Sequence, residues 1–150
     1  MNKTIDVDVT VALTKYEPSE SFDAEYDSFK DTKEYKGTLA QIENGWEIIY
    51  YTEANEVRTT VRIYADSASV NFESTTNYLM YFKAGQITKT MQLLGDIYTE
   101  FDVETTNIES DVCMDGGKFS VEFVLYDISS GDSKMKLEMS ISPDLSIIMS

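Results

Sequence analysis

Histidine is absent from the 150 residues, and cysteine occurs once, at Cys113. The missing imidazole excludes Ser-His-Asp and Cys-His nucleophile systems and histidine metal ligands. A single cysteine excludes an internal disulfide. The chain also lacks G-x-S-x-G, C-x-x-C and glycine-rich phosphate-loop motifs. We therefore expect no catalysis and no cofactor, and we interpret Cys113 as a small buried hydrophobic residue rather than a nucleophile.

Basic residues are scarce as well. Twelve lysines and arginines oppose 27 acidic residues, which gives a formal net charge of −15. Such a charge disfavours a nucleic-acid backbone or an anionic membrane as partner. No apolar run approaches the ~20 residues that span a bilayer, and the N-terminal sequence MNKTIDVDVTVALTKY has no signal-peptide pattern. We expect a cytoplasmic protein without a membrane span that binds no nucleic acid.

What the sequence does have is alternation of apolar and polar residues with period two. It begins in the run from Ile5 to Leu13 and returns along most of the chain, with turn residues such as Asn44-Gly45 between the runs. This pattern predicts half-buried strands. A meander of eight or more short strands closes to remove its edges. We predict one all-β domain over residues 1–150, a single closed antiparallel up-and-down barrel of about eight to ten strands, closed by the first run against the C-terminal strands.

Two hairpins can be tested for register, because a slip of one residue would turn every apolar side chain outward. The first has a two-residue loop at Ala54-Asn55, and the second a three-residue loop at Ser129-Ser130-Gly131, with Gly131 at the position of positive φ. The opposed residues that follow are Trp46–Ile63, Ile48–Val61 and Tyr50–Thr59 in the first hairpin, and Leu125–Met135, Phe123–Leu137, Val121–Met139 and Phe119–Ile141 in the second.

Both arginines, Arg58 and Arg62, lie on one face of one predicted strand. Two arginines could hold a dianion between them. The first hairpin register instead places Arg62 opposite Glu47 and Arg58 opposite Tyr51, which are ordinary arrangements for an exterior face. We favour this structural interpretation.

The one long connection, Glu17 to Glu34, shows no period-two alternation and has a net charge of −5. Phe22, Tyr26 and Phe29 follow one another at helical spacing within it. We predict a loop with one short helix around Phe22 to Phe29, which covers an open end of the barrel.

Acidic residues also gather between Asp96 and Asp115, where the net charge is −7. The spacing of a calcium loop is missing, so no metal site is predicted. The simpler explanation for these acidic residues is a solvated face that aids solubility. The more specific explanation is a docking surface for a basic protein.

The inward positions of the predicted strands are rich in aromatic residues and methionine. Such side chains could line a pocket for an apolar ligand, or could simply fill the barrel, since an eight-stranded barrel lies at the size where both outcomes occur. The inward set is Trp46, Tyr50, Phe72, Met80, Phe82, Met91, Phe101, Phe119, Phe123, Met135 and Met139, with Gln41, Tyr50 and Thr59 as polar anchors.

From this set we predict a lumen site for a small apolar or amphipathic molecule, and ligand binding as the function. The alternative is a protein-interaction module with a packed core that acts through its acidic surface; a metal-independent enzyme using carboxylates is a remote third. The predicted ligand-binding residues are Trp46, Tyr50, Thr59, Phe82, Met91, Phe101, Phe123 and Met139.

The order of several segments resembles the YwiB-like family of uncharacterised calycin-type β-barrel proteins from Gram-positive bacteria. The resemblance covers roughly Lys33 to Ser142 and implies a closed, lipocalin-like barrel without an established activity, so it assigns no functional residue. The segments that carry it are EYKGTL (34–39), NGWEIIYYTE (44–53), TTVRI (59–63), YLMYFKAGQ (78–86), the Gly95 turn with Thr99 and Thr105, and GGKFSVEFVLYDISSGDSKMKLEMSIS (116–142).

Overall fold

Ten antiparallel strands form the structure, a computed structural model that describes residues 4–18, 26–52, 57–73, 78–94, 97–127 and 131–144. No helix occurs in these ranges, and none of them therefore contains a helix that could cross a membrane. The strands are β1 (Thr4–Pro18), β2 (Tyr26–Ile42), β3 (Gly45–Thr52), β4 (Val57–Ile63), β5 (Ser67–Glu73), β6 (Tyr78–Lys83), β7 (Ile87–Leu94), β8 (Ile97–Ser110), β9 (Gly117–Asp127) and β10 (Gly131–Pro143).

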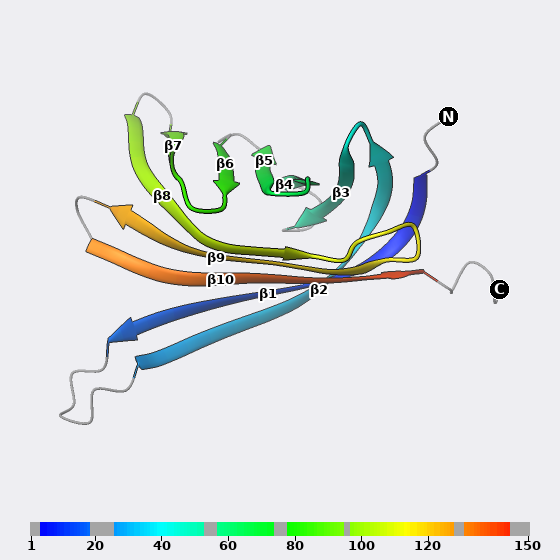
Figure 1. The fold of residues 1–150 in the computed structure, drawn as a ribbon, viewed down its shortest axis with the longest axis horizontal. Helices are drawn as coiled ribbons and strands as arrows, with labels where there is room; N and C mark the ends of the chain where they lie inside the picture. The colour runs from blue at the N-terminus through cyan, green and yellow to red at the C-terminus, as the bar shows by residue number, and fades with distance from the viewer. Residues whose placement is uncertain are drawn as a thin grey trace.

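Each strand pairs with its neighbours in the sequence, and β1 closes the ring against β10 (Figure 1). The closing ladder runs from Val7 opposite Pro143 to Tyr16 opposite Lys134. The predicted all-β, up-and-down closed barrel is therefore confirmed, with the strand count at the upper end of the expected range. The shortest pairing in the ring joins β6 and β7 at only two positions.

The predicted helix around Phe22 to Phe29 is wrong from Tyr26 onward. β1 extends to Pro18 and β2 already begins at Tyr26, opposite it; residues 19–25 lie outside the described ranges. The connection is thus shorter than the segment from Glu17 to Glu34. The helical spacing does not decide the structure here, because the segment pairs with β1 along its whole length and the backbone groups that point toward β1 form ladder hydrogen bonds.

The hairpin between β3 and β4 has the predicted register, with Trp46 opposite Ile63 and Tyr50 opposite Thr59. The register of the β9–β10 hairpin is wrong by two residues. Phe123 lies opposite Met135, and Gly131 pairs with Asp127 instead of belonging to the loop. A shift of two residues leaves every side chain on its predicted face, because side-chain direction repeats with the same period.

The barrel interior is packed tightly at the end that holds the β2–β3 and β8–β9 turns. Several aliphatic side chains there are fully buried, and Tyr35 stacks on Tyr50 with ring centroids 5.0 Å apart. This packing supplies the apolar burial that stabilises the fold. The aliphatic core residues with 0% exposure are Val7, Val9, Leu39, Ile48, Val61, Ala68, Val103 and Val121.

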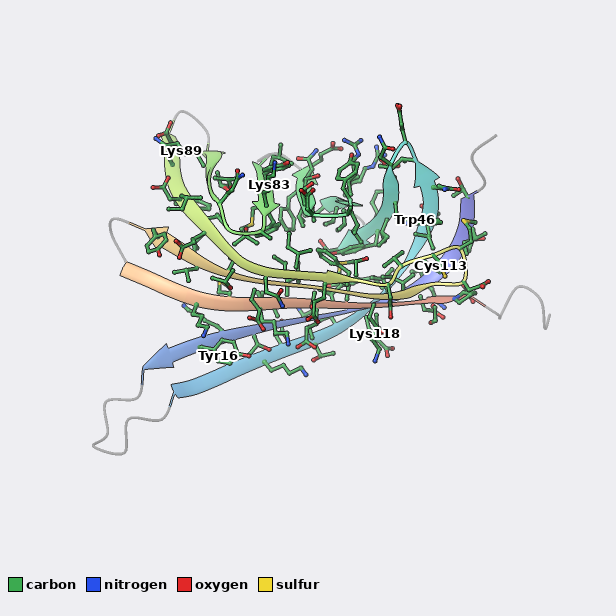
Figure 2. The ribbon with its side chains drawn as sticks, in the orientation of Figure 1. Tyr16, Trp46, Lys83, Lys89, Cys113 and Lys118 are labelled. Carbon is green, nitrogen blue, oxygen red and sulfur yellow. The ribbon has the colours of Figure 1, made fainter. Side chains whose placement is uncertain are left out.

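Cys113 is exposed, so its predicted burial is wrong. It lies in the turn between β8 and β9, where Cys113 and Gly116 form an isolated bridge through two backbone hydrogen bonds of 2.8 and 3.0 Å (Figure 2). The neighbouring Val112 is buried. Because successive side chains point to opposite sides of an extended chain, burial of Val112 leaves Cys113 in solvent.

Gly116 in this turn offers a test of the barrel end. Its φ is +97°, and a Cβ atom there would overlap the carbonyl oxygen of Ile141 on β10. We expect Gly116→Ala to lower the free energy of unfolding by more than the ~1–2 kcal/mol of the backbone conformation alone. Gly85→Ala is the control, because Gly85 has a φ of +76° but open space around a Cβ. Equal losses for both variants in urea unfolding would contradict the close approach of β10.

Candidate functional site

An apolar pocket of about 240 Å³ occupies the other end of the barrel interior. Strands β1, β5, β6, β8, β9 and β10 contribute its walls, and every lining residue is hydrophobic. The lining residues are Leu13, Val70, Phe72, Met80, Phe82, Phe101, Phe123, Leu125, Met135 and Leu137. We refer to this cavity as the luminal pocket.

The pocket has a buried floor and an exposed rim. Phe82 is 1% exposed and its ring lies 4.9 Å from that of Phe123, whereas Leu13 is 37% exposed. Phe123 lies opposite Met135 across the β9–β10 ladder, so alternate residues of both strands face the same cavity. The period-two pattern of these strands therefore builds the wall, and the ring pair closes its inner end.

Three buried threonine hydroxyls without a hydrogen-bond partner belong to residues beside the lining phenylalanines. Residues directly opposite each other on paired strands share a face, so the three threonines point into the barrel. Buried hydroxyls normally have partners, and an unsatisfied one destabilises the fold. Each is opposite a phenylalanine of the luminal pocket: Thr59 opposite Phe72, Thr90 opposite Phe101, and Thr105 opposite Phe123.

Removing such a hydroxyl should stabilise the protein. We expect Thr59→Val to raise the free energy of unfolding by about 1 kcal/mol, since burial of an unpaired hydroxyl costs ~1–3 kcal/mol. Thr106→Val is the control, because the Thr106 hydroxyl donates to the carbonyl oxygen of Glu122 at 3.0 Å. Chemical denaturation measures both. A loss of stability in Thr59→Val would contradict the missing partner.

The structure brings together only some of the predicted site residues. Phe82, Phe101 and Phe123 line the luminal pocket. Tyr50 and Thr59 are buried in the barrel, and Met139 is buried outside this lining. Position 91 on β7 is opposite Leu79, which is 50% exposed, whereas the preceding Thr90 is buried and opposite Phe101. The register therefore places position 91 on the outward face, and the predicted place of Met91 in the lumen is wrong; its side chain lies outside the described part.

Trp46 lies at a different place. It lines an open hollow with Gln41, Tyr64 and Val112 near the β2–β3 turn, away from the β1–β2 and β9–β10 hairpin ends (Figure 2). The predicted ligand-binding residues also leave out the aliphatic part of the pocket wall. Leu13, Leu125 and Leu137 carry the same period-two signal, which could have identified them.

The two arginines lie on the outer face of the barrel. Arg62 donates from Nε to Glu47 Oε2 at 2.9 Å, as the hairpin register predicted. This hydrogen bond raises the pKa of Arg62. Arg58 is opposite Tyr51 on one side and Glu73 on the other. Since Arg62 is already engaged, the pair does not form a clamp for a dianion.

Some acidic residues of β8 and β9 form ion pairs with lysines or accept a hydrogen bond from a tyrosine hydroxyl. Lys89 Nζ lies 4.0 Å from Glu100, and Lys136 Nζ lies 3.8 Å from Glu122. The Tyr126 hydroxyl donates to Glu104 at 3.2 Å. Within the described residues, no group of three or more carboxylates or thiols is arranged to hold a metal ion.

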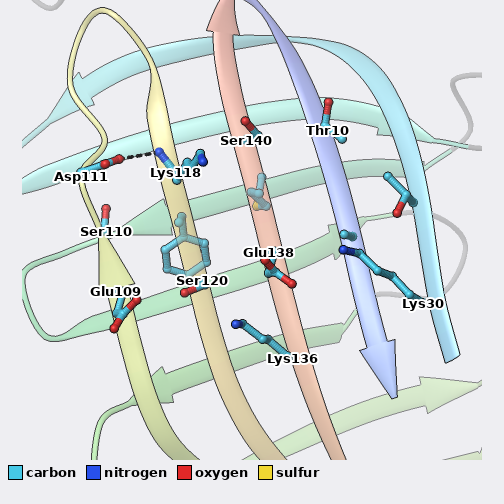
Figure 3. A pocket seen from close by; sticks show the side chains of 14 residues that line it. Thr10, Lys30, Glu109, Ser110, Asp111, Lys118, Ser120, Lys136, Glu138 and Ser140 are labelled. Atoms are coloured by element: carbon cyan, nitrogen blue, oxygen red, sulfur yellow. Dashed lines mark hydrogen bonds between the residues drawn. The ribbon is translucent and has the colours of Figure 1, made fainter. Parts of the chain in front are cut away.

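A second concavity, of about 590 Å³, lies on the outer face over β8, β9, β10, β1 and β2. Figure 3 shows short polar side chains such as Thr10 and Ser140 between longer charged ones. Lys30 and Lys136 contribute positive charge, and Glu138 contributes negative charge. This groove is open and carries both signs of charge, whereas the luminal pocket is apolar throughout.

The closed antiparallel barrel with an apolar lumen defines the structural class of the protein. Residues 21–139 match the family described as "Domain of unknown function (DUF1934)", and the chain belongs to this family. The fold is similar to that of the ywiB protein from Bacillus subtilis, seen in its crystal structure, with a TM-score of 0.70, 16% sequence identity, and 91% of this chain and 92% of that chain covered. The resemblance to the YwiB-like family is thereby confirmed. No curated protein matches the sequence.

Proposed function

We propose that the barrel binds one small, largely apolar molecule in the luminal pocket, in the manner of a lipocalin-like carrier. The observation that supports the proposal is an apolar cavity of about 240 Å³ that persists beside a tightly packed half of the same barrel. Evenly filled interiors leave few voids larger than a water molecule. A cavity of this size, open at the Leu13 rim, therefore fits a binding role better than a filled core.

The volume indicates the size of the ligand. An apolar cavity of ~150 Å³ binds benzene, whereas sites for drug-sized molecules begin at ~300 Å³. A substituted aromatic ring or a medium-length acyl chain fits between these limits. A polar group on such a ligand could face the solvent at the rim or the unpartnered threonine hydroxyls next to the lining phenylalanines.

Calorimetric titration with toluene, octanoate and palmitate tests the proposal. We expect saturable binding of toluene and octanoate, and weaker binding of palmitate, whose chain exceeds the cavity. Leu137→Trp should abolish binding by filling the pocket. Leu79→Trp is the matched control, since Leu79 is 50% exposed and outside the pocket. Absence of saturable binding by every probe would contradict the proposal and favour the acidic surface as a docking site for a basic protein.

The single tryptophan provides a check on location. Because Trp46 does not line the luminal pocket, its emission should stay unchanged when toluene or octanoate saturates the protein. Phe101→Trp, in a Trp46→Phe background, places the fluorophore in the wall instead, and its emission should change with the same midpoint as the calorimetric titration. A saturable change from Trp46 alone would place the ligand at the opposite end of the barrel.

A further inference from the structure

The second strand has a long edge that pairs with no other strand in the described part of the chain. β2 pairs with β1 from Tyr26 to Ala40, but with β3 only from Gly37 to Ile42. Positions 26–36 thus have no pairing partner within the described ranges on the side away from β1. In Figure 1, β1 lies between β10 and β2, and β2 is on the outer side. A row of backbone donors and acceptors is therefore available to another strand.

The middle of this edge is exposed and strongly charged. Residues 30–34 read Lys-Asp-Thr-Lys-Glu, and all five are exposed. Lys33 and Asp31 have side chains 63% and 74% exposed and form an ion pair of 3.8 Å within the strand. Charges on an edge strand usually prevent pairing with another chain. The order of these charges decides whether they do so here.

Only some registers are open to two antiparallel copies of one strand. Directly opposed residues either both point their backbone groups toward the partner or both point them away, and this alternates along the strand. Opposed positions in two identical strands must therefore be both even or both odd. A two-fold axis then passes through a residue that lies opposite its own copy.

Charge selects one of these registers. With the axis at Thr32, Asp31 of each copy lies opposite Lys33 of the other, and Lys30 lies opposite Glu34. Four opposite-charge pairs form, two on each face of the sheet. Cross-strand pairs of this kind stabilise antiparallel sheets, and like charges directly opposed destabilise them.

Neighbouring registers are penalised by the same residues. Moving the axis by one or two positions in either direction places Asp31, Lys33, Lys30 or Glu34 directly opposite its own copy. Thr32 is the one uncharged residue in the run. Lys36 is already paired with Asp8 and with Asp144 in its own chain, and in the Thr32 register it lies opposite position 28, an uncharged serine, so its ion pairs persist.

We propose that β2 pairs in antiparallel fashion with β2 of a second copy of this chain, with the two-fold axis at Thr32. Residues 28–36 of each copy form the new ladder, which is about 30 Å long at ~3.3 Å per residue. The two barrel walls become one continuous sheet across the dimer. The partner is a second copy of the chain, because residues 30–34 read in the opposite direction present the opposite charge at each charged position.

Sedimentation equilibrium of charge-reversed variants tests the register. Asp31→Lys turns two attractive contacts into two repulsive ones, and we expect the dimer to weaken roughly tenfold or more. The double variant Asp31→Lys/Lys33→Asp should restore it, because the pairs re-form with their signs exchanged. Glu100→Lys on β8 is the control with the same change in net charge. Since lowering a net charge of −15 favours association in general, this control should not weaken the dimer.

Cysteine cross-linking gives a second readout. In a Cys113→Ser background, Thr32→Cys should form a covalent dimer with a short bis-maleimide reagent, because only the axial residue meets its own copy. Lys36→Cys should not. A monomer at every concentration would overturn the proposal, as would a dimer that the Asp31→Lys reversal leaves unchanged or a cross-link at position 36 rather than 32. Unchanged unfolding midpoints in the single variants exclude a folding defect as the cause.

Discussion

Deleting residues 1–14 is expected to abolish the monomeric, cooperatively unfolding protein and to produce aggregates. β1 pairs with β10 on one side and with β2 on the other, so its removal opens the barrel and exposes two long edges at once. Two fully buried core residues, Val7 and Val9, are lost with it. Open apolar edges are templates for pairing between chains. Size-exclusion chromatography and thermal unfolding of residues 15–150 measure the outcome.

The control is a truncation that removes only residues 145–150, which lie beyond the described ranges and after the end of β10 at Pro143. This variant should keep the elution volume and the cooperative transition of the full chain. If residues 15–150 instead remained monomeric and unfolded cooperatively, closure of the barrel by β1 would not be needed for its stability.

Phe82→Ala is expected to lower the free energy of unfolding by ~3–5 kcal/mol, the usual cost of removing a buried aromatic side chain. Phe82 is 1% exposed and forms the floor of the luminal pocket with Phe123. The substitution also enlarges the pocket. Naphthalene should therefore bind this variant more tightly than the unmodified protein and should recover part of the lost stability, because a ligand that binds only the folded state stabilises it.

Phe119→Ala is the matched control for this experiment. Phe119 is also 1% exposed but does not line the luminal pocket, so its truncation should have a similar cost without rescue by naphthalene. Thermal unfolding with and without the ligand distinguishes the two variants. Equal rescue of both, or of neither, would show that the cavity beside Phe82 is not the binding site.

The alternation of apolar residues was sufficient to predict the all-β class, the closed meander and the inward face of most strands. The face was wrong for β7, where Thr90 is buried and Ile87 is 61% exposed. The alternation also predicted the β3–β4 register, with Trp46 opposite Ile63. The three-residue loop before β10 could begin at either of two positions that preserve the same faces. The sequence therefore predicted the face of Met135 but not its partner.

The sequence predicted an apolar site inside the barrel, but only some of the predicted residues line the pocket that the structure contains. Phe82, Phe101 and Phe123 belong to the luminal pocket, whereas Trp46 lies beside a different hollow. Alternation with period two indicates whether a side chain points inward, but it does not indicate how far along the barrel axis the side chain lies. Position along the axis depends on strand tilt and on register around the whole ring.

The sequence by itself determined most of the strands and, in most of them, the side that faces the interior, because alternation follows from the geometry of an extended chain. Tertiary structure alone decided that Tyr26 to Phe29 join β2 instead of a helix, that one half of the barrel is packed while the other is hollow, and that β2 leaves β3 beyond Gly37. Those outcomes depend on which distant strands meet when the ring closes, and residues far apart in the sequence contribute to that closure together.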